Sequence, residues 1–287
     1  MHFFLCRLAI LPPLRYYISK IGKNRFLRMK ILLTNDDGIA APGMEALVKA
    51  LHEEHKVMVS APDRQRSATS RSLTCLDALY AKRHTYAFAP EVEAYAVSGT
   101  PADCARLGES NLFDGQADIL LSGINDGGNL GTDVLYSGTC GAAQEAALQG
   151  MNAVAVSLLW DPLLPRHFDT AVEIARYALA YAIKNPLPFG LFYNVNVPNL
   201  PMDKIKGIKH CPLGMVLYPR GYEEHAEEEG RRVFTMVPGG PLPTDMDAYT
   251  DARWIREGYV TVTVLGYDCG VCMSKQITEE EFLAEQL

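Results

Sequence analysis

The sequence predicts an α/β protein in which a mostly parallel sheet is covered by helices on both faces. Short apolar runs recur along the first two thirds of the chain, and segments with apolar residues at helical spacing separate them. This alternation is typical of sheets built from β-α-β units. With 48% hydrophobic and 21% charged residues, the 287-residue chain can build a large core.

The first β-α-β unit opens at residue 29. "MKILLT" (29–34) and "KVMVSAP" (56–62) are apolar runs of strand length, as expected for strands buried on both faces. Between them, "PGMEALVKALHEEH" (42–55) has apolar residues at helical spacing and begins with Pro42, a residue favoured in the first turn of a helix. We therefore expect a strand, a helix and a second strand here.

The same alternation continues to about residue 200. We expect further strands at 92–97, 117–122, 152–159 and 191–198. We expect helices at 101–109, 138–150 and 168–183.

The pattern changes beyond residue 200, where Gly, Pro and charged residues become more frequent. Residues 221–247 predict a projecting hairpin or a long loop, and the alternating run "GYVTVTVLGY" (258–267) predicts a strand. We divide the chain into a core at 29–200 and a C-terminal extension at 201–287 that is suited to contacts between subunits.

Residues 1–28 contain arginine and lysine but no aspartate or glutamate. Such a composition is typical of organelle transit peptides, and the apolar run at its start is too short for a transmembrane helix. Because Met29 is followed directly by the first strand, we favour the alternative that Met29 is the true start and that 1–28 is an extension outside the fold.

The net charge and the cysteine content of the chain exclude some classes of function and favour one compartment. The net charge is −7, and because residues 1–28 are basic, the rest of the chain is still more acidic; this disfavours binding to a nucleic-acid polymer. Seven scattered cysteines, an odd number, argue against a disulfide framework and favour the cytoplasm. We interpret the lone CxxC at Cys269 and Cys272 as a non-metal feature.

Three polar stretches follow predicted strands, at 35–38, 61–72 and 122–139. Ligands of open α/β sheets bind beyond the carboxyl ends of the strands. In the first stretch, Asp36 and Asp37 are adjacent, and two carboxylates in contact repel by roughly 1 kcal/mol in water and by more at lower dielectric. A divalent cation such as Mg²⁺, Mn²⁺ or Ca²⁺ relieves this repulsion. The alternative is an Asp-Asp-Gly turn without metal.

The third stretch is rich in glycine, which lets the backbone approach a ligand closely. Asn125 and Asn129 offer amide groups, and Ser137, Gly138 and Thr139 open a predicted helix whose amino end can hold an anion. The alternative for Ser137 is ordinary helix capping. A metal beside an anion site suits phosphoryl chemistry. The sequence contains no GxGxxG and no GxxxxGK[ST] motif, so we do not expect a dinucleotide cofactor or a Walker-type site.

At these residues the chain resembles the SurE family, the stationary-phase survival proteins that act as metal-dependent 5'-nucleotidases. The resemblance covers residues 29 to about 160 densely and the C-terminal part more thinly. The matching motifs are "ILLTNDDGIAAPG", "APDRQRSATSRSLT", "GTPADCARL", "ADILLSGINDGGNLGTDVLYSGTCGAAQEA" and "EGYVTVTVL". In the second motif, Ala68 stands where the family commonly has a glycine.

The resemblance implies a set of site residues. It implies that one divalent ion per subunit, Mg²⁺ or Mn²⁺, is held by Asp36, Asp37, Ser67 and Asn125. We further expect Asp36 and Asp37 to be the catalytic residues, one of which orients the attacking water. It implies a phosphate pocket formed by Asn129, Ser137, Gly138 and Thr139. Ser67 carries no signal of its own in the sequence, because a lone serine between Arg66 and Ala68 is typical of any loop.

The resemblance also implies a Rossmann-like three-layer sandwich with a subunit-exchanged C-terminal extension, in a homodimer or homotetramer. The expected reaction is release of phosphate from nucleoside 5'-monophosphates, and from 3'-monophosphates, without a membrane partner. Attack by water and a covalent aspartyl-phosphate both remain open. A non-catalytic nucleotide-binding module is the alternative to an enzyme, whereas the absence of GxGxxG disfavours a cofactor-dependent Rossmann enzyme. No histidine lies in the three polar stretches, so we do not expect a histidine acid.

Overall fold

The computed structural model describes residues 28–113, 115, 117–159, 161, 163–225, 230–237 and 249–267. The extension at 1–28, except for its last residue, and the Cys269/Cys272 pair lie outside these ranges, as does part of the predicted hairpin at 221–247.

The centre of the fold is a nine-stranded sheet with the order β3-β4-β2-β1-β5-β6-β7-β11-β8. Six neighbouring strands, from β4 to β7, run parallel, which confirms the predicted α/β class. These strands are β1 (Lys30–Thr34), β2 (Lys56–Pro62), β4 (Ala89–Val97), β5 (Ile119–Asp126), β6 (Asn152–Leu158) and β7 (Leu191–Val197). The remaining strands of the sheet are β3 (Ala81–Tyr86), β8 (Ile208–His210) and β11 (Val260–Gly266).

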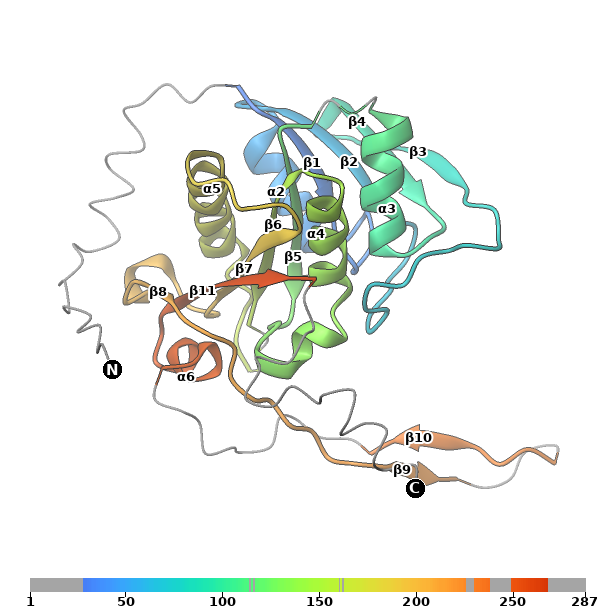
Figure 1. Cartoon of the computed structure of the whole chain (residues 1–287), viewed down its shortest axis with the longest axis vertical. Coiled ribbons are helices and arrows are strands. Elements are labelled where there is room, and N and C mark those ends of the chain that lie inside the picture. Colours follow the sequence, from blue (N-terminus) through green and yellow to red (C-terminus); the bar gives the residue numbers. More distant parts are fainter. Residues whose placement is uncertain are drawn as a thin grey trace, which may run out of the picture.

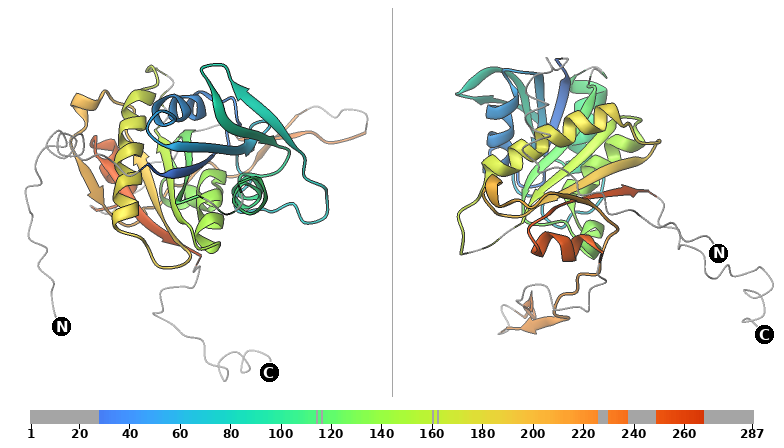
Figure 2. Two further views of the ribbon diagram at one scale, coloured as in Figure 1. Left: turned by 90° about the horizontal axis from the view of Figure 1, so that it is seen from above. Right: turned by 90° about the vertical axis from the view of Figure 1, so that its left-hand side faces the viewer.

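Helices cover both faces of the sheet, so the core has three layers (Figures 1 and 2). The helices α2 (Pro42–Leu51) and α5 (Phe168–Lys184) pack on one face, and α3 (Pro101–Leu107) and α4 (Gly138–Leu148) pack on the other. Successive side chains of a strand point to opposite faces. Accordingly, Ile31 and Leu33 of β1 lie in the core under α2 and α5, whereas Leu32 lies in the core under α3 and α4.

The strand order reverses direction beside β1. From β1 the chain builds outward through β2 and β4, then returns to place β5 on the other side of β1 and continues through β6 and β7. The loops after β1 and β5 therefore leave the sheet toward different helical layers, which opens a crevice at their carboxyl ends. Two of the three predicted polar stretches follow these two strands.

The C-terminal segment completes the sheet. β11 pairs antiparallel with β7, and β8 pairs parallel with β11, so the strand predicted at 258–267 is confirmed. A second, two-stranded sheet joins β9 (Tyr222–Glu224) to β10 (Phe234–Met236) as an antiparallel pair that projects from the body (Figure 1). The short helix α6 (Asp251–Arg256) lies between this hairpin and β11 in the chain.

Several elements differ from the sequence expectation. β3 was not expected, because its "AKRHTY" lacks apolar alternation; it is an edge strand whose side chains are mostly exposed. α6 was not expected either, since a helix of six residues is too short to show a period. β5 extends to Asp126, so Asn125 lies in the strand and not in the following loop. Within the described ranges, no helix has the length and apolarity needed to span a bilayer.

Candidate active site

Asp36 is a buried carboxylate between the end of β1 and the amino end of α4. Asp36 is only 5% exposed to solvent, and the Thr139 hydroxyl donates a hydrogen bond of 2.5 Å to its Oδ1. Gly138 makes this approach possible, because a Cβ at that position would lie 2.9 Å from the Asp36 Cβ and 2.9 Å from Pro101 Cγ. The first turn of α4 is therefore pressed against the Asp36 carboxylate, at the helix end that favours negative charge.

Burial raises the pKa of Asp36 from 3.8 to about 6. The Thr139 hydrogen bond opposes this rise, and the charge of Asp37 adds to it by less than burial does. The sequence pointed to repulsion between the two aspartates, but removal of Asp36 from water is the larger effect on its pKa. A buried carboxylate with a raised pKa gains strongly from a cation that replaces its lost hydration.

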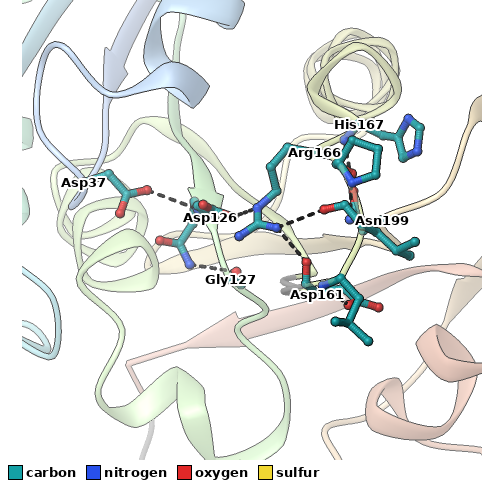
Figure 3. A network of polar contacts seen from close by, with 11 residues as sticks. Asp37, Asp126, Gly127, Asp161, Arg166, His167 and Asn199 are labelled. Carbon is teal, nitrogen blue, oxygen red and sulfur yellow. Dashed lines mark hydrogen bonds and ion pairs between the residues drawn. The ribbon is translucent and has the colours of Figure 1, made fainter.

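Asp37 belongs to a network of charged and polar groups on the other side of the crevice (Figure 3). The backbone N–H of Asp126 donates to Asp37 Oδ2 at 3.1 Å, and Asp126 Oδ1 accepts from Arg166 Nε at 2.5 Å. Arg166 also donates to the backbone oxygen of Asp161 at 2.8 Å. Burial raises the pKa of Asp37; against this, the hydrogen bond from the Asp126 N–H lowers the pKa, and the charge of the Asp126 carboxylate raises it by less. Arg166 thus offsets the charge of Asp126, which acts on Asp37.

Asn125 lies near the carboxyl end of β5 and has one side-chain oxygen without a partner in the described part of the chain. Its Nδ2 donates to the Gly127 backbone oxygen at 2.7 Å, whereas its Oδ1 has no hydrogen-bond partner among the described residues. An amide oxygen fixed in this way is a suitable ligand for a hard cation.

Asn129 is held by a buried amide network. Its Nδ2 donates to Ser157 Oγ at 2.7 Å, and its backbone N–H donates to Asn196 Oδ1 at 2.8 Å. The Asn129 backbone oxygen accepts from Nδ2 of both Asn194 and Asn196, at 2.9 and 3.0 Å. This network fixes the glycine-rich loop and leaves one Asn129 Nδ2 hydrogen for an anion.

The loop that carries Ser67 is tied to the end of β1. The backbone N–H of Arg66 donates to the Asp36 backbone oxygen at 2.7 Å, and Gln65 Nε2 donates to Ser67 Oγ at 2.9 Å. α4 supports the loop from the other side, and only a glycine fits at 141, because a Cβ there would lie 2.2 Å from the Ser70 oxygen. Ser67 is therefore brought next to Asp36 by contacts that the sequence did not reveal.

Ser137 caps α4, as the alternative interpretation of the sequence expected. Its Oγ accepts from the Cys140 backbone N–H at 3.0 Å. The hydroxyl hydrogen of Ser137 is not used in this cap, so capping and anion binding are compatible.

The donor set fits a divalent cation. The described residues contain no group of three or more His, Cys, Asp or Glu side chains arranged to hold a metal. The candidate set instead joins two carboxylates, Asp36 and Asp37, to the neutral oxygens of Ser67 and Asn125. Oxygen ligands with one or two carboxylates are typical of Mg²⁺ sites that also take phosphate and water.

Sequence reasoning missed several residues that shape this site. Asp126 lies within a matching motif but was not singled out, and Arg166 lies outside every motif; their contact in the fold points to a role for both. Asn194 and Asn196 did carry a signal, since two asparagines at alternate positions of an apolar strand point to the same face.

The Asp251 side chain, buried in α6, was also missed. It accepts from the backbone N–H of Gly131 at 2.9 Å and of Gly214 at 2.6 Å, and so ties the C-terminal segment to the glycine-rich loop.

Comparisons with known proteins identify relatives of this chain. The family model described as "Survival protein SurE" matches residues 31–220. A protein named 5'-nucleotidase SurE from Cyanothece sp. (strain PCC 7425 / ATCC 29141) is 40% identical over 248 residues, covering 84% of this chain and 91% of its own. One of the same name from Clostridium botulinum (strain ATCC 19397 / Type A) is 38% identical over 256 residues, covering 89% of this chain and all of its own.

A solved structure shows the same fold. The crystal structure of a SurE protein from Aquifex aeolicus superposes with a TM-score of 0.72 and 31% identity, covering 89% of this chain and 99% of that one. The family match spans the strands and loops that build the crevice, and the relatives align over most of their length. This chain belongs to the SurE family.

Proposed function

We propose that this protein is a divalent-metal-dependent phosphomonoesterase that hydrolyses nucleoside 5'-monophosphates, and 3'-monophosphates, to nucleoside and phosphate. The observation that carries the proposal is the buried Asp36 carboxylate, which contacts the amino end of α4 where the strand order reverses beside β1. The relatives named 5'-nucleotidase support the nucleotide substrate.

The candidate ligands are Asp36, Asp37, Ser67 and Asn125, for one Mg²⁺ or Mn²⁺ ion per subunit. When bound there, a divalent ion supplies positive charge for the phosphoryl oxygens and lowers the pKa of a coordinated water. Asp36 and Asp37 are in addition the proposed catalytic residues, of which one orients the attacking water. The free oxygen of Asn125 and the exposed hydroxyl of Ser67 complete the set without adding charge.

The phosphate is held on the α4 side of the crevice. The backbone N–H groups at Gly138 and Thr139, the Ser137 hydroxyl and the second Nδ2 hydrogen of Asn129 are donors for its non-bridging oxygens. These donors are held in place before substrate arrives, by the helix and by the asparagine network. Preorganised donors stabilise the charge that redistributes in the transition state.

A direct assay tests the proposal. The full chain, freed of metal with EDTA, is assayed for phosphate release from AMP and GMP before and after addition of Mn²⁺ or Mg²⁺. We expect activity only with metal, and a loss of at least about a thousandfold when Asp36→Asn and Asp37→Asn are combined. The control is Asp77→Asn, an exposed aspartate outside the crevice. Activity that survives chelation or the double substitution contradicts the proposal.

The C-terminal segment 201–287 is proposed to mediate assembly into a homodimer or homotetramer by exchange between subunits. The projecting hairpin supports this, because Tyr222, Phe234 and Met236 on β9 and β10 are exposed within one chain. Apolar side chains of this size on a two-stranded hairpin are expected to be covered in an assembly. Light scattering of the purified protein measures the mass, and a monomer at micromolar concentration contradicts this proposal.

A further inference from the structure

A cleft of about 410 Å³ opens on the α2 and α5 side of the crevice, beside Asp37 and Asp126. Its lining also includes the segment between β1 and α2, the residues that follow β2, and Phe168 at the start of α5. The phosphate donors at α4 lie on the opposite side of β1, so this cleft is not part of the phosphate pocket. Its volume is in the range of pockets that hold small ligands.

One wall of the cleft is already fixed. The Asn35 side chain donates to the Gly38 backbone oxygen at 2.9 Å and accepts from the Gly38 N–H at 3.1 Å, while Ile39 N–H donates to the Pro62 oxygen at 2.9 Å. Gly38 adopts a φ of +103°, which disfavours other residues. A wall that needs no ordering lowers the free-energy cost of binding.

The carboxylates of the lining suit the hydroxyl groups of a ligand. Three carboxylates line the cleft, those of Asp37, Asp63 and Asp126. Asp63 is paired with Arg66 at 3.4 Å and Asp126 with Arg166 at 2.5 Å, so each keeps oxygens that can accept further hydrogen bonds. Such carboxylates accept hydrogen bonds from hydroxyl groups, as acidic residues do for the ribose in dinucleotide-binding folds.

The remaining side chains suit a flat heterocycle. Phe168 offers a partly buried aromatic ring, and Gln65 has an amide that also contacts Ser67, the proposed metal ligand. The Arg64 guanidinium, also in the lining, forms no hydrogen bond or ion pair with the described residues. Aromatic rings and guanidinium planes both stack on nucleobases.

We propose that this cleft binds the nucleoside part of the substrate, with the ribose hydroxyls on the carboxylates of Asp63 and Asp126 and the base against Phe168. The proposal rests on the proposed nucleotidase function and deepens it. Asp37 lines both the cleft and the candidate metal site, so one molecule can place its phosphate near Asp36 and its nucleoside here. The cleft is then the part of the site that distinguishes a nucleotide from other phosphate esters.

The test compares AMP with p-nitrophenyl phosphate, which has no nucleoside. We expect Phe168→Ala to lower the ratio of kcat/KM for AMP to kcat/KM for p-nitrophenyl phosphate by about tenfold, the size expected for loss of one stacked base. Phe168→Leu, which keeps apolar bulk in the core, should lower the ratio less. The control is Phe189→Ala, which removes an exposed ring just before β7, at the other end of the sheet, and should leave the ratio unchanged.

A ratio that is the same in Phe168→Ala and wild type overturns the nucleoside assignment while leaving the proposed function intact. Failure of the wild-type protein to hydrolyse AMP or p-nitrophenyl phosphate with metal overturns both. A second measurement does not depend on catalysis: calorimetric titration of the EDTA-treated protein with adenosine. We expect at least about fivefold weaker binding to Phe168→Ala than to Phe189→Ala. Equal affinities of the two variants contradict the assignment.

Discussion

Replacing Asp36 by asparagine is expected to stabilise the metal-free protein at neutral pH and to abolish its response to divalent ions. Asp36 is almost fully buried, and no arginine or lysine pairs with its carboxylate among the described residues. In the absence of metal, the ionised carboxylate therefore destabilises the folded state. Asparagine has the same shape and can still accept the Thr139 hydrogen bond, so it removes the charge with little change in packing.

The magnitude follows from the pKa of Asp36. A rise from 3.8 to about 6 corresponds to about 3 kcal/mol of differential stability. Because the folded-state pKa is the higher one, the contribution of Asp36 to stability is most favourable below pH 4 and is lost as the pH rises through 6. Relative to wild type, Asp36→Asn should be equally stable at pH 4 and more stable by about 2–3 kcal/mol at pH 8.

The assay is urea unfolding of EDTA-treated protein at pH 4, 6 and 8, at one protein concentration, with Asp77→Asn as the exposed control. Adding Mn²⁺ at pH 8 should raise the unfolding midpoint of wild type but not of Asp36→Asn, since an ion that binds only the folded state stabilises it. The reasoning is refuted if Asp36→Asn is less stable than wild type at pH 8 without metal, or if the difference between them does not depend on pH.

Three further substitutions test other parts of the site. Ala68 has a φ of +56°, a backbone conformation that is strained for alanine but not for glycine. Ala68→Gly should therefore raise the free energy of unfolding in urea by about 0.5–1 kcal/mol, and an unchanged or lower value contradicts backbone strain at this position. Gly138→Ala places a Cβ 2.9 Å from that of Asp36 and should lower kcat for AMP at least about tenfold, whereas retained kcat shows that α4 can shift freely. Asp251→Ala leaves the buried Gly131 N–H without its acceptor and should lower the free energy of unfolding in urea by about 2–4 kcal/mol. A decrease below about 1 kcal/mol would show that this hydrogen bond contributes little to stability.

The order of strands and helices could be predicted from the sequence because it depends on local periodicity. Each parallel strand is buried on both faces and so consists of consecutive apolar residues, as in β1. The carboxyl ends of such strands were identifiable for the same reason, and with them Asp36, Asp37 and the start of α4. β3 and α6 could not be predicted, because an exposed edge strand and a single short helix leave no such pattern.

The sequence by itself therefore determined the fold class, the two aspartates at a strand end and the helix that opens at Gly138. Only the tertiary structure decided that burial, more than repulsion, raises the pKa of Asp36, that Asp126 and Arg166 stand beside Asp37, and that a cleft reaches Phe168. The reason is that periodicity depends on neighbours along the chain. Desolvation and ion pairing depend instead on distances between segments that are 40 to 103 residues apart in sequence and meet only when the sheet forms.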